Sequence, residues 1–266
     1  MAISPKATLN FLYRNYQRSF SNPFSQGFGE SGNNSNEKGI YSGINIKLNS
    51  KIEWSGYADC FSFPWLKYRV DAPTNGYGLF SMITYQPNKK TKFELRYTQK
   101  EKEINQANSE STITPVVTDA TKNYRFAFEY NISPTFSLGN KIDYVSFREA
   151  QNPLENGFAM SFNVALQTPS KRVGVESRYT LFDTDSYNSR IYATEKDILY
   201  SYSSAMYQNA GTRFYVNLKA SPIKSLTFWL RYSIYSYKGL DQIGSGYDVI
   251  QGNKKSEVKA QMRYAF

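Results

Sequence analysis

Apolar and polar residues alternate along most of the chain with a period of two. Near the start, Ala7, Leu9, Phe11 and Tyr13 alternate with residues that are mostly polar. The same alternation recurs in the segments 43–48, 92–97, 123–130, 157–166, 213–219, 226–235 and 256–266. Successive side chains of a β-strand point to opposite faces, so this period predicts strands with one apolar and one polar face. No window of useful length favours the helical period, and the chain is predicted to be all-β.

Turn residues divide these runs in a regular way. Tight turns are predicted at 49–50, 86–89, 133–135, 168–171 and 221–224, and longer polar connections at 17–37, 63–75, 101–121, 148–156, 183–210 and 238–253. Short and long connections therefore alternate, which in an antiparallel meander places the tight turns at one end and the long loops at the other. The pattern predicts about twelve strands, most of them close to the ~9–11 residues that a tilted strand needs to cross a bilayer. The extended segment 197–207 is expected to form a hairpin within the sixth long loop.

The alternation alone fits two environments, a soluble β-sandwich or solenoid and a sheet in lipid. Four features favour lipid: the long strands, the asymmetric turns, the final aromatic residue and the aromatic residues near strand ends. Those aromatic residues are Tyr13, Tyr41, Trp54, Tyr57, Tyr85, Tyr97, Tyr130, Tyr144, Tyr179, Tyr232 and Tyr264. An aromatic content of 17% with a mean hydropathy of −0.57 also suits strands that face lipid on one side only.

The predicted fold is therefore a transmembrane antiparallel up-and-down β-barrel of about twelve strands, or the C-terminal arc of a larger barrel. Residues 1–266 are expected to form a single outer-membrane barrel domain, and the bacterial outer membrane, with its lipid and lipopolysaccharide, is the expected location. No run of about 18–20 apolar residues predicts a transmembrane helix. The first twenty residues lack a secretory signal pattern, and the chain is expected to be a piece of a longer protein.

The formal net charge is +10, from 32 basic and 22 acidic residues. This charge raises the possibility of nucleic-acid binding, but the charged residues are mixed in sign and spread over the polar face. Exposure to lipid costs such a charge ~2–4 kcal/mol at the bilayer midplane, so these residues are predicted to face the lumen. They are Arg14, Lys47, Glu53, Asp59, Lys92, Glu94, Arg96, Arg125, Glu129, Lys141, Asp143, Arg172, Glu176, Arg178, Arg213, Lys219, Arg231, Glu257, Lys259 and Arg263. Two interpretations remain open: a solvated network of charges, and a weakly anion-selective pore or polyanion conduit.

The composition excludes several kinds of chemistry. The chain has no His and one Cys, so Ser-His and Cys-His catalytic pairs, His-ligated zinc and disulfides within the chain are absent. Asp183-Thr184-Asp185 resembles the start of a calcium loop but lacks the Gly and the distal Glu of an EF-hand, which favours a capped loop. Cys60 falls on the apolar face and is expected to face lipid. The sequence predicts no catalytic residue, cofactor or metal, and a non-enzymatic protein.

Two long loops contain the remaining candidate binding residues. In the loop 63–75, the aromatic and charged residues are expected either to stack on sugar or lipid A or to fold over the barrel mouth; they are Phe63, Trp65, Tyr68, Arg69 and Asp71. In the loop 183–210, Arg190 is expected near Asp183 and Asp185. At the C-terminus, Tyr264 and Phe266 end an alternating strand, a pattern that resembles the signal recognised by the barrel-assembly machinery.

Several segments resemble a known family. They are Leu12–Tyr16, Asn36–Tyr41, Phe63–Pro73, Leu181–Tyr192 and Gly252–Val258. Together they resemble the C-terminal region of large outer-membrane proteins of the Bacteroidota that contain a helix-hairpin-helix domain, and the resemblance covers nearly the whole chain. It implies a membrane barrel preceded in the family by a signal peptide and the helix-hairpin-helix region. Both are missing from this sequence, so the DNA-binding suggestion attached to that region does not extend to these residues.

The function expected from the sequence is passage or scaffolding by a non-enzymatic barrel whose lumen carries mixed charge with a basic excess. The alternative is a surface-binding module whose long loops engage polysaccharide or a partner protein. The sequence does not identify that protein partner. A soluble β-protein and an enzyme are less favoured.

Overall fold

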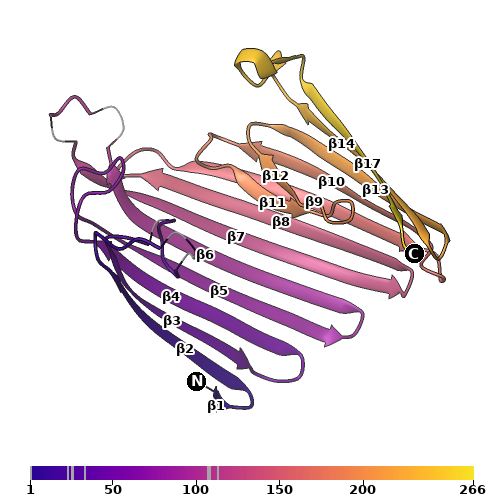
Figure 1. The fold of residues 1–266 in the computed structure, drawn as a ribbon, viewed down its shortest axis with the longest axis horizontal. Coiled ribbons are helices and arrows are strands. Elements are labelled where there is room, and N and C mark those ends of the chain that lie inside the picture. Colours follow the sequence, from indigo (N-terminus) through magenta and orange to yellow (C-terminus); the bar gives the residue numbers. More distant parts are fainter. Residues whose placement is uncertain (1, 23, 25–26, 33, 107–108, 113) are drawn as a thin grey trace. The chain divides into compact units, whose positions relative to one another are not determined.

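A computed structural model describes residues 2–22, 24, 27–32, 34–106, 109–112 and 114–266 (Figure 1). Among these residues the secondary structure is almost entirely β. The long strands are β2 (Ala7–Tyr16), β3 (Glu37–Lys47), β4 (Ile52–Phe63), β5 (Thr74–Asn88), β6 (Thr91–Asn105), β7 (Val116–Ser133), β8 (Phe136–Glu149), β9 (Glu155–Gln167), β10 (Val173–Thr184), β13 (Gly211–Ile223), β14 (Leu226–Tyr237) and β17 (Lys254–Tyr264). The shorter elements are β1 (Ala2–Ser4), β11 (Ile191–Glu195), β12 (Ser203–Tyr207), β15 (Gln242–Ile243), β16 (Ile250–Gln251) and a 3₁₀ turn at Gly246–Asp248.

Strand pairing follows chain order. The main sheet runs β1-β2-β3-β4-β5-β6-β7-β8-β9-β10-β13-β14-β17, and only the β11–β12 hairpin and the β15–β16 pair lie outside it among the described strands. The pairs whose registers are resolved are antiparallel, for example β3 with β4 and β10 with β13. This order confirms the predicted all-β, up-and-down architecture with twelve long strands. No helix of the described residues is long and apolar enough to span a membrane.

The chain divides into two compact units. The first unit comprises Met1–Tyr85, Leu95–Tyr124 and Ser146–Leu154, and the second comprises Gln86–Glu94, Arg125–Val145 and Glu155–Phe266.

The tight turns at 49–50, 133–135 and 168–171 lie where the sequence predicts them, whereas the turns after β5 and β13 begin later than predicted, after Asn88 and Ile223. Two of the five turns share one mechanism. The Asn49 side-chain oxygen accepts hydrogen bonds from the backbone N–H groups of Lys51 and Ile52, at 2.8 and 2.9 Å. The Asn88 oxygen does the same for the N–H groups of Lys90 and Thr91. Such Asx turns provide backbone donors with a local partner where the ladder ends.

Several strand boundaries differ from the predicted ones. The expected loop 101–121 is shorter, because β6 continues to Asn105 and β7 begins at Val116. Phe63 and Asp183, both predicted in loops, belong to strands. Phe63 is buried and pairs with Thr74, and Asp183 pairs with Phe158, so the ladders extend past the last alternating apolar residue.

In both units the polar face is the buried one. In the second unit Ser161, Thr180, Arg231 and Ser233 have no exposed surface. The opposite face exposes large apolar side chains to roughly 40% each: Phe158, Phe162, Tyr179, Leu181, Leu218, Phe228, Leu230 and Tyr232. A water-soluble sheet shows the reverse arrangement, since apolar burial stabilises folding in water.

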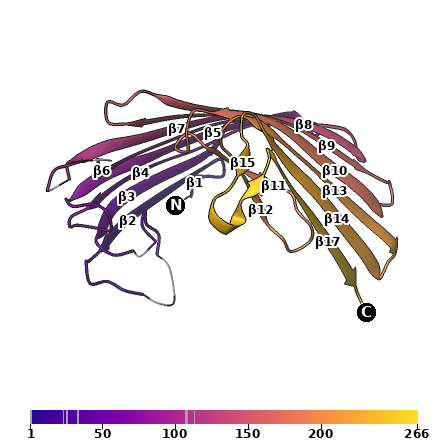
Figure 2. The same cartoon turned by 90° about the horizontal axis from the view of Figure 1, so that it is seen from above.

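The sixth long loop contains a hairpin, as predicted, but its strands lie at 191–195 and 203–207 rather than throughout 197–207, and the hairpin folds back against the sheet. Strands β11 and β12 pair from Ile191↔Tyr207 to Glu195↔Ser203. Figure 2 shows them on one side of β10, β13 and β14, and the bonds of Arg213 and Arg231 to Glu195 identify this side as the polar face. Apolar contacts fix the base of this hairpin. Its members Ile191, Ala193, Ala205 and Tyr207 form a buried cluster with Val145, Ala159 and Phe182.

Candidate functional site

Four neighbouring strands bring charged side chains into rows on the polar face of the second unit. Direct cross-strand pairing aligns Glu176, Asn217, Arg231 and Lys259 on β10, β13, β14 and β17. Two further rows align Arg178, Tyr215, Ser233 and Glu257, and Thr180, Arg213, Tyr235 and Lys255. Side chains directly opposite one another in adjacent strands point to the same face. The period-two pattern therefore gathers Arg178, Arg213, Arg231 and Lys259 into one group, here named the wall cations.

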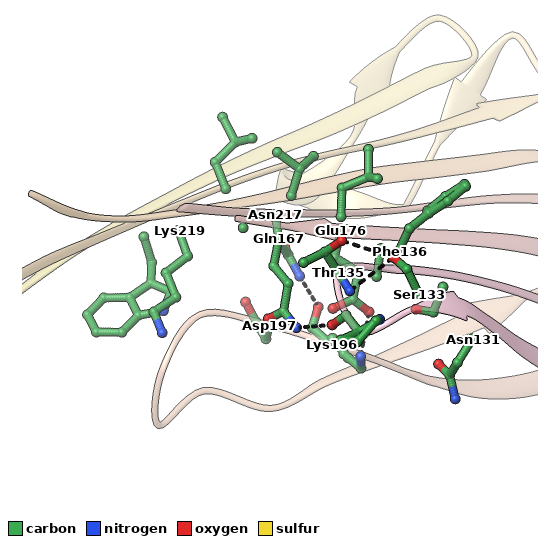
Figure 3. Close-up of a pocket in the computed structure, with 18 residues that line it drawn as sticks. Asn131, Ser133, Thr135, Phe136, Gln167, Glu176, Lys196, Asp197, Asn217 and Lys219 are labelled. Carbon is green, nitrogen blue, oxygen red and sulfur yellow. Dashed lines mark hydrogen bonds and ion pairs between the residues drawn. The ribbon is translucent and has the colours of Figure 1, made fainter. Parts of the chain in front are cut away.

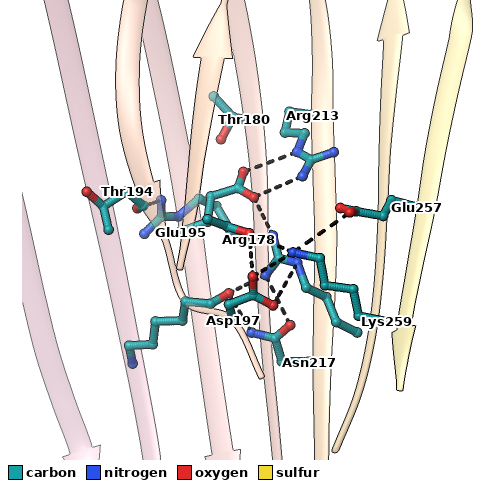
Figure 4. A network of polar contacts seen from close by, with 12 residues as sticks. Arg178, Thr180, Thr194, Glu195, Asp197, Arg213, Asn217, Glu257 and Lys259 are labelled. Atoms are coloured by element: carbon teal, nitrogen blue, oxygen red, sulfur yellow. Dashed lines mark hydrogen bonds and ion pairs between the residues drawn. The ribbon is translucent and has the colours of Figure 1, made fainter. Parts of the chain in front are cut away.

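The hairpin supplies two carboxylates that pair with Arg213, Arg231 and Lys259 (Figure 4). Glu195 accepts two hydrogen bonds from Arg213, at 3.1 Å from Nε and 3.0 Å from Nη2, and it also binds Arg231. Asp197 lies 2.8 Å from Lys259 Nζ and 3.7 Å from Arg231 Nε. The side chains of Glu195, Asp197 and Arg231 are completely buried. Arg231 thus bridges both carboxylates.

Local hydrogen bonds organise the hairpin tip. Asp197 also accepts bonds from the Ser203 hydroxyl at 2.5 Å, the Ser201 hydroxyl at 3.1 Å and the Ile198 N–H at 2.7 Å. Burial by itself would raise the pKa of Asp197, but the bonds from Lys259, Ser203 and Ile198 outweigh it and hold this pKa well below its usual range. Asp197 is therefore a charged ligand for the wall at neutral pH.

The residue between the two carboxylates, Lys196, strengthens the attachment. Its carbonyl oxygen accepts bonds from Asn217, at 2.8 Å, and from Arg231. Its ammonium group lies 3.0 Å from Glu176. Three successive hairpin residues thus contact strands β10, β13, β14 and β17.

Aromatic side chains lie beneath several of these cations. The Arg213 guanidinium stands 4.2 Å from the ring centroid of Tyr235, and Arg231 stands 4.4 Å from that of Tyr215. Arg178 lies 5.6 Å from the same Tyr215 ring. Desolvated contacts of this kind contribute about 2 kcal/mol each, and they keep the guanidinium planes in place whatever anion faces them.

A cavity of about 420 Å³ opens beside the hairpin tip (Figure 3). Its lining includes polar side chains from β9, β10 and β13, from the turn between β7 and β8, and from the hairpin tip, among them Thr135, Gln167, Glu176, Lys196, Asp197, Asn217 and Lys219. The cavity therefore reaches from the turn end of these strands to the buried ionic cluster.

The first unit has an ionic cluster of its own. Arg14 lies 2.6 Å from Glu37 and 2.7 Å from Asp59, and the side chains of Arg14 and Glu37 are almost completely buried. Glu37 also accepts bonds from the N–H groups of Glu30 and Ser31, at 2.8 and 3.1 Å. A Cβ at residue 39 would lie 2.7 Å from Arg14 Nη2, which explains the glycine there.

The predicted lumen charges separate into groups by their contacts. Arg125 and Lys141 both bind Asp143, Lys92 lies 3.6 Å from Glu94, and Lys47 pairs across the ladder with Glu53. Arg263 stands over the Trp229 ring at 5.8 Å, and Lys219 pairs with Trp229 on the other side. By strand alternation Arg96 lies on the same face of β6 as Glu94, and Glu129 lies on the same face of β7 as Arg125. Arg172 differs, because it lies in the exposed turn before β10.

The predicted loop residues form local contacts. Trp65 is held by Asn36, whose side chain bonds both its N–H and its carbonyl, at 3.0 and 2.8 Å. Asp71 accepts a bond from Asn105 at 2.9 Å, and the Arg69 guanidinium stacks 5.2 Å from the Tyr68 ring. Burial, together with nearby lysines, lowers the pKa of Lys67 in the same loop.

The expected contact of Arg190 with Asp183 and Asp185 is not among the described interactions. Arg190 instead donates to the Tyr187 carbonyl and the Tyr192 hydroxyl, and its guanidinium stacks 3.8 Å from the Tyr187 ring. Asp185 accepts a bond from the Asn156 N–H at 2.7 Å. Within the described residues no group of His, Cys, Asp or Glu is arranged to hold a metal ion.

Two of the aromatic residues that the sequence places near strand ends lie on the polar face of the sheet rather than on the apolar face. Tyr41 pairs with Asp59, and Tyr57 stacks 5.2 Å from Phe80, so both rings lie on the polar face. At the C-terminus, Tyr264 pairs with Leu226 and packs edge-on against Phe266 at 5.3 Å. Cys60 is exposed on the apolar face.

Sequence reasoning missed the carboxylates that complete both clusters. Glu195 is the last residue of the short strand β11, Asp197 lies in the hairpin tip, and Glu37 lies at the start of a long strand, so no long alternating run distinguishes any of them. The spacing of Glu195 and Asp197 by two residues is the one available signal, because an extended segment places both on one face.

No protein-family model matches this sequence. A comparison with curated proteins finds no match either. Among solved structures, the Ferric-Catecholate import receptor Fiu from E. coli K12, in its open form, aligns with 85% of this chain and 48% of its own, at a TM-score of 0.49 and 9% identity. A Pseudomonas aeruginosa FadL homologue aligns with 85% of this chain and 66% of its own, at a TM-score of 0.39 and 7% identity. The chain thus spans about half the length of Fiu.

Proposed function

We propose that this chain is a membrane-spanning segment of a non-enzymatic outer-membrane β-barrel, through which small solutes pass under the control of the inner hairpin. The observation that carries this proposal is the inverted burial of the strands. Arg231 is fully buried on one face, whereas its neighbour Leu230 is 44% exposed on the other. Lipid is the solvent that favours exposed apolar strand faces.

Energetics support the same arrangement. A side chain such as Leu or Phe stabilises folding in water by about 1.5–3 kcal/mol when it is buried, and a row of them left open forfeits that stabilisation. A charged side chain facing the bilayer midplane would cost ~2–4 kcal/mol. Both costs vanish if the apolar face meets lipid and the charged face lines a lumen.

Passage under control, rather than scaffolding alone, is supported by the cavity beside the hairpin. The cavity is lined largely by polar and charged side chains, and the hairpin that borders it is attached through Glu195 and Asp197. A hairpin held by ion pairs fills part of the lumen and can be displaced without breaking the wall strands.

The surroundings follow from this assignment. The apolar face would contact outer-membrane lipid and lipopolysaccharide, and Tyr264 with Phe266 would serve as the signal for the barrel-assembly machinery. The resemblance to Bacteroidota helix-hairpin-helix proteins suggests that the barrel belongs to a longer chain. Cross-linking of cysteines placed on β2 and β17 would distinguish a barrel closed within this chain from an arc completed by further strands.

The experiment that tests the proposal is extraction followed by electrophysiology. The expected result is recovery from membranes only with detergent, and stepwise conductance in planar bilayers that increases when residues 191–207 are replaced by a short Gly-Ser linker. Recovery in the soluble fraction would end the barrel assignment. Silence of both proteins in bilayers would reject passage and leave a scaffold or binding role.

A surface-binding role is the second candidate, and exposed loop aromatics favour it. Tyr68 is 85% exposed and Trp65 is 52% exposed, with the Arg18 guanidinium 5.1 Å from the Trp65 ring. Aromatic faces beside guanidinium groups suit stacking on sugars. Retention of the protein on immobilised outer-membrane polysaccharide, lost in Trp65→Ala/Tyr68→Ala, would support this role.

A further inference from the structure

We propose that the wall cations form a binding site for a small di- or tricarboxylate solute. When the hairpin is docked, the carboxylates of Glu195 and Asp197 occupy this site instead of the solute. This inference rests on the proposed passage function, because it identifies what displaces the hairpin. The hairpin then acts as an internal competitor for the solute that the lumen admits.

The geometry around Glu195 is that of a carboxylate-binding site. Arg213 presents two N–H groups to the two carboxylate oxygens at 3.1 and 3.0 Å, the forked arrangement that Arg forms with any free carboxylate. Arg231 contributes a further donor to the same carboxylate and also lies next to Asp197. Two carboxylates joined by a short spacer are therefore what this group of cations accepts.

The wall carries more binding capacity than the hairpin uses. Arg231 Nε is buried and has no hydrogen-bond acceptor among the described atoms, with Asp197 3.7 Å away. The described hydrogen bonds of Arg178 go to neutral oxygens, those of Asn163 at 2.5 Å and the Thr194 carbonyl at 2.9 Å. A flexible solute with two or three carboxylates can satisfy these donors better than the fixed hairpin does.

A route to the site exists. The cavity of about 420 Å³ is bordered by Asp197 and Asn217, both of which contact wall cations. Its volume lies within the range of about 300–1,000 Å³ found for small-molecule sites. Its lining mixes amide, hydroxyl and charged groups, which suits a hydrophilic solute.

The two ends of the hairpin are attached by different forces, which makes exchange feasible. Its base is packed through Ile191, Ala193 and Tyr207, with the Tyr207 ring stacked 5.2 Å from that of Phe182. Its tip is held by charges. Removing the tip alone would leave buried cations unpaired, at a high cost, whereas an incoming carboxylate keeps them paired.

The test measures hairpin docking directly. In a Cys60→Ser background, Ile198→Cys introduces a thiol in the hairpin tip itself, at a partly buried position whose backbone N–H donates to Asp197. Maleimide labelling of the detergent-solubilised protein is followed with citrate or with chloride at equal ionic strength and pH. The expected result is a rise of about fivefold or more in the labelling rate with citrate, consistent with a population shift towards the undocked hairpin. An equal rate in citrate and chloride would overturn the proposal.

Inorganic phosphate provides the comparison between anions. Phosphate has oxyanion charge but lacks paired carboxylates, so a smaller effect than that of citrate is expected. An equal effect would overturn the assignment to carboxylates and leave a general anion site.

Matched variants check that the response depends on this site. Arg213→Gln/Arg231→Gln should label rapidly without citrate and show no citrate response. Lys100→Gln removes an ion pair with Glu30 in the other unit and should keep the full response. The heat-dependent gel mobility of each variant verifies that it is folded, and a citrate response that survives Arg213→Gln/Arg231→Gln in folded protein would contradict the proposal.

The labelling assay requires no pore, so the two proposals can fail separately. A citrate response in a protein that is silent in bilayers would reject passage and retain the carboxylate site. Conductance without any citrate response would retain passage and reject the site.

Discussion

The two ionic clusters of the polar face are assembled from different parts of the chain. Arg14, Glu37 and Asp59 all belong to strands, and the connection above them adds hydrogen bonds to Glu37 from the N–H groups of Glu30 and Ser31 and from the Ser31 hydroxyl. In the second unit the strands supply the cations, and the hairpin supplies Glu195 and Asp197. The first cluster keeps both its carboxylates when its covering loop moves, whereas the second loses Glu195 and Asp197 when the hairpin leaves and retains Glu257, 3.8 Å from Lys259. Only the second can therefore couple ion pairing to opening.

The largest expected effect comes from Arg231→Met. This change removes the cation that bridges Glu195 and Asp197 and leaves both carboxylates buried with fewer partners. Breaking a buried ion pair in this way costs about 3–5 kcal/mol, and we expect a loss of that size in the free energy of unfolding, measured by urea titration in detergent. Lys219→Met is the control, because Lys219 lies on the same face and makes none of the ion pairs described here. Equal losses in both variants would contradict the bridging role.

A smaller loss is expected for Arg14→Met. Glu37 would retain its bonds from the N–H groups of Glu30 and Ser31, and Asp59 is 15% exposed and can be solvated. We expect a cost of about 1–3 kcal/mol in the same titration. A loss as large as that of Arg231→Met would show that the backbone N–H donors do not stabilise the Glu37 carboxylate once Arg14 is removed.

The pH dependence of stability should distinguish the hairpin. Because the folded-state pKa of Asp197 is depressed below its unfolded value of about 3.9, its stabilisation is complete above that value and declines as the pH falls below it. The difference in unfolding free energy between wild type and Asp197→Asn should stay constant from neutral pH to about pH 5 and shrink in more acidic solution. A difference that already shrinks near neutral pH would contradict the charged state of Asp197.

The smallest effect is expected for Lys100→Gln. Its ion pair with Glu30 measures 2.5 Å, but the Lys100 side chain is 48% exposed. Solvent screening limits such pairs to about 0–1 kcal/mol, so urea titration should barely separate this variant from wild type. A loss above that range would mean that surface pairs contribute as much as buried ones.

The sequence predicts the sheet well, because strand alternation and turn chemistry are local. Asn49 and Asn88 form their turns with residues two and three positions away. The pattern does not decide which face an aromatic residue near a run end occupies, and the aromatic residues that favour lipid in the sequence therefore include Tyr41 and Tyr57, which lie on the polar face.

The docking of the hairpin could not be predicted, although the segment itself was expected to be extended. Glu195 binds Arg213 and Arg231, which lie 18 and 36 residues away along the chain. Such partners become evident only once the register of β10, β13, β14 and β17 is known. The sequence places the wall cations on one face but does not indicate what neutralises them.

The three tryptophans allow the most direct test of the inverted sheet. Trp54 lies on the apolar face, where it pairs with Ile83, and Trp229 lies on the polar face between Lys219 and Gln261. Both are near the tight-turn ends of their strands. Single-tryptophan variants that retain one or the other can be reconstituted in vesicles of brominated phosphatidylcholine. Strong quenching of Trp54 with weak quenching of Trp229 is the predicted result, and equal quenching of the two, or none of either, would contradict a sheet whose apolar face meets lipid.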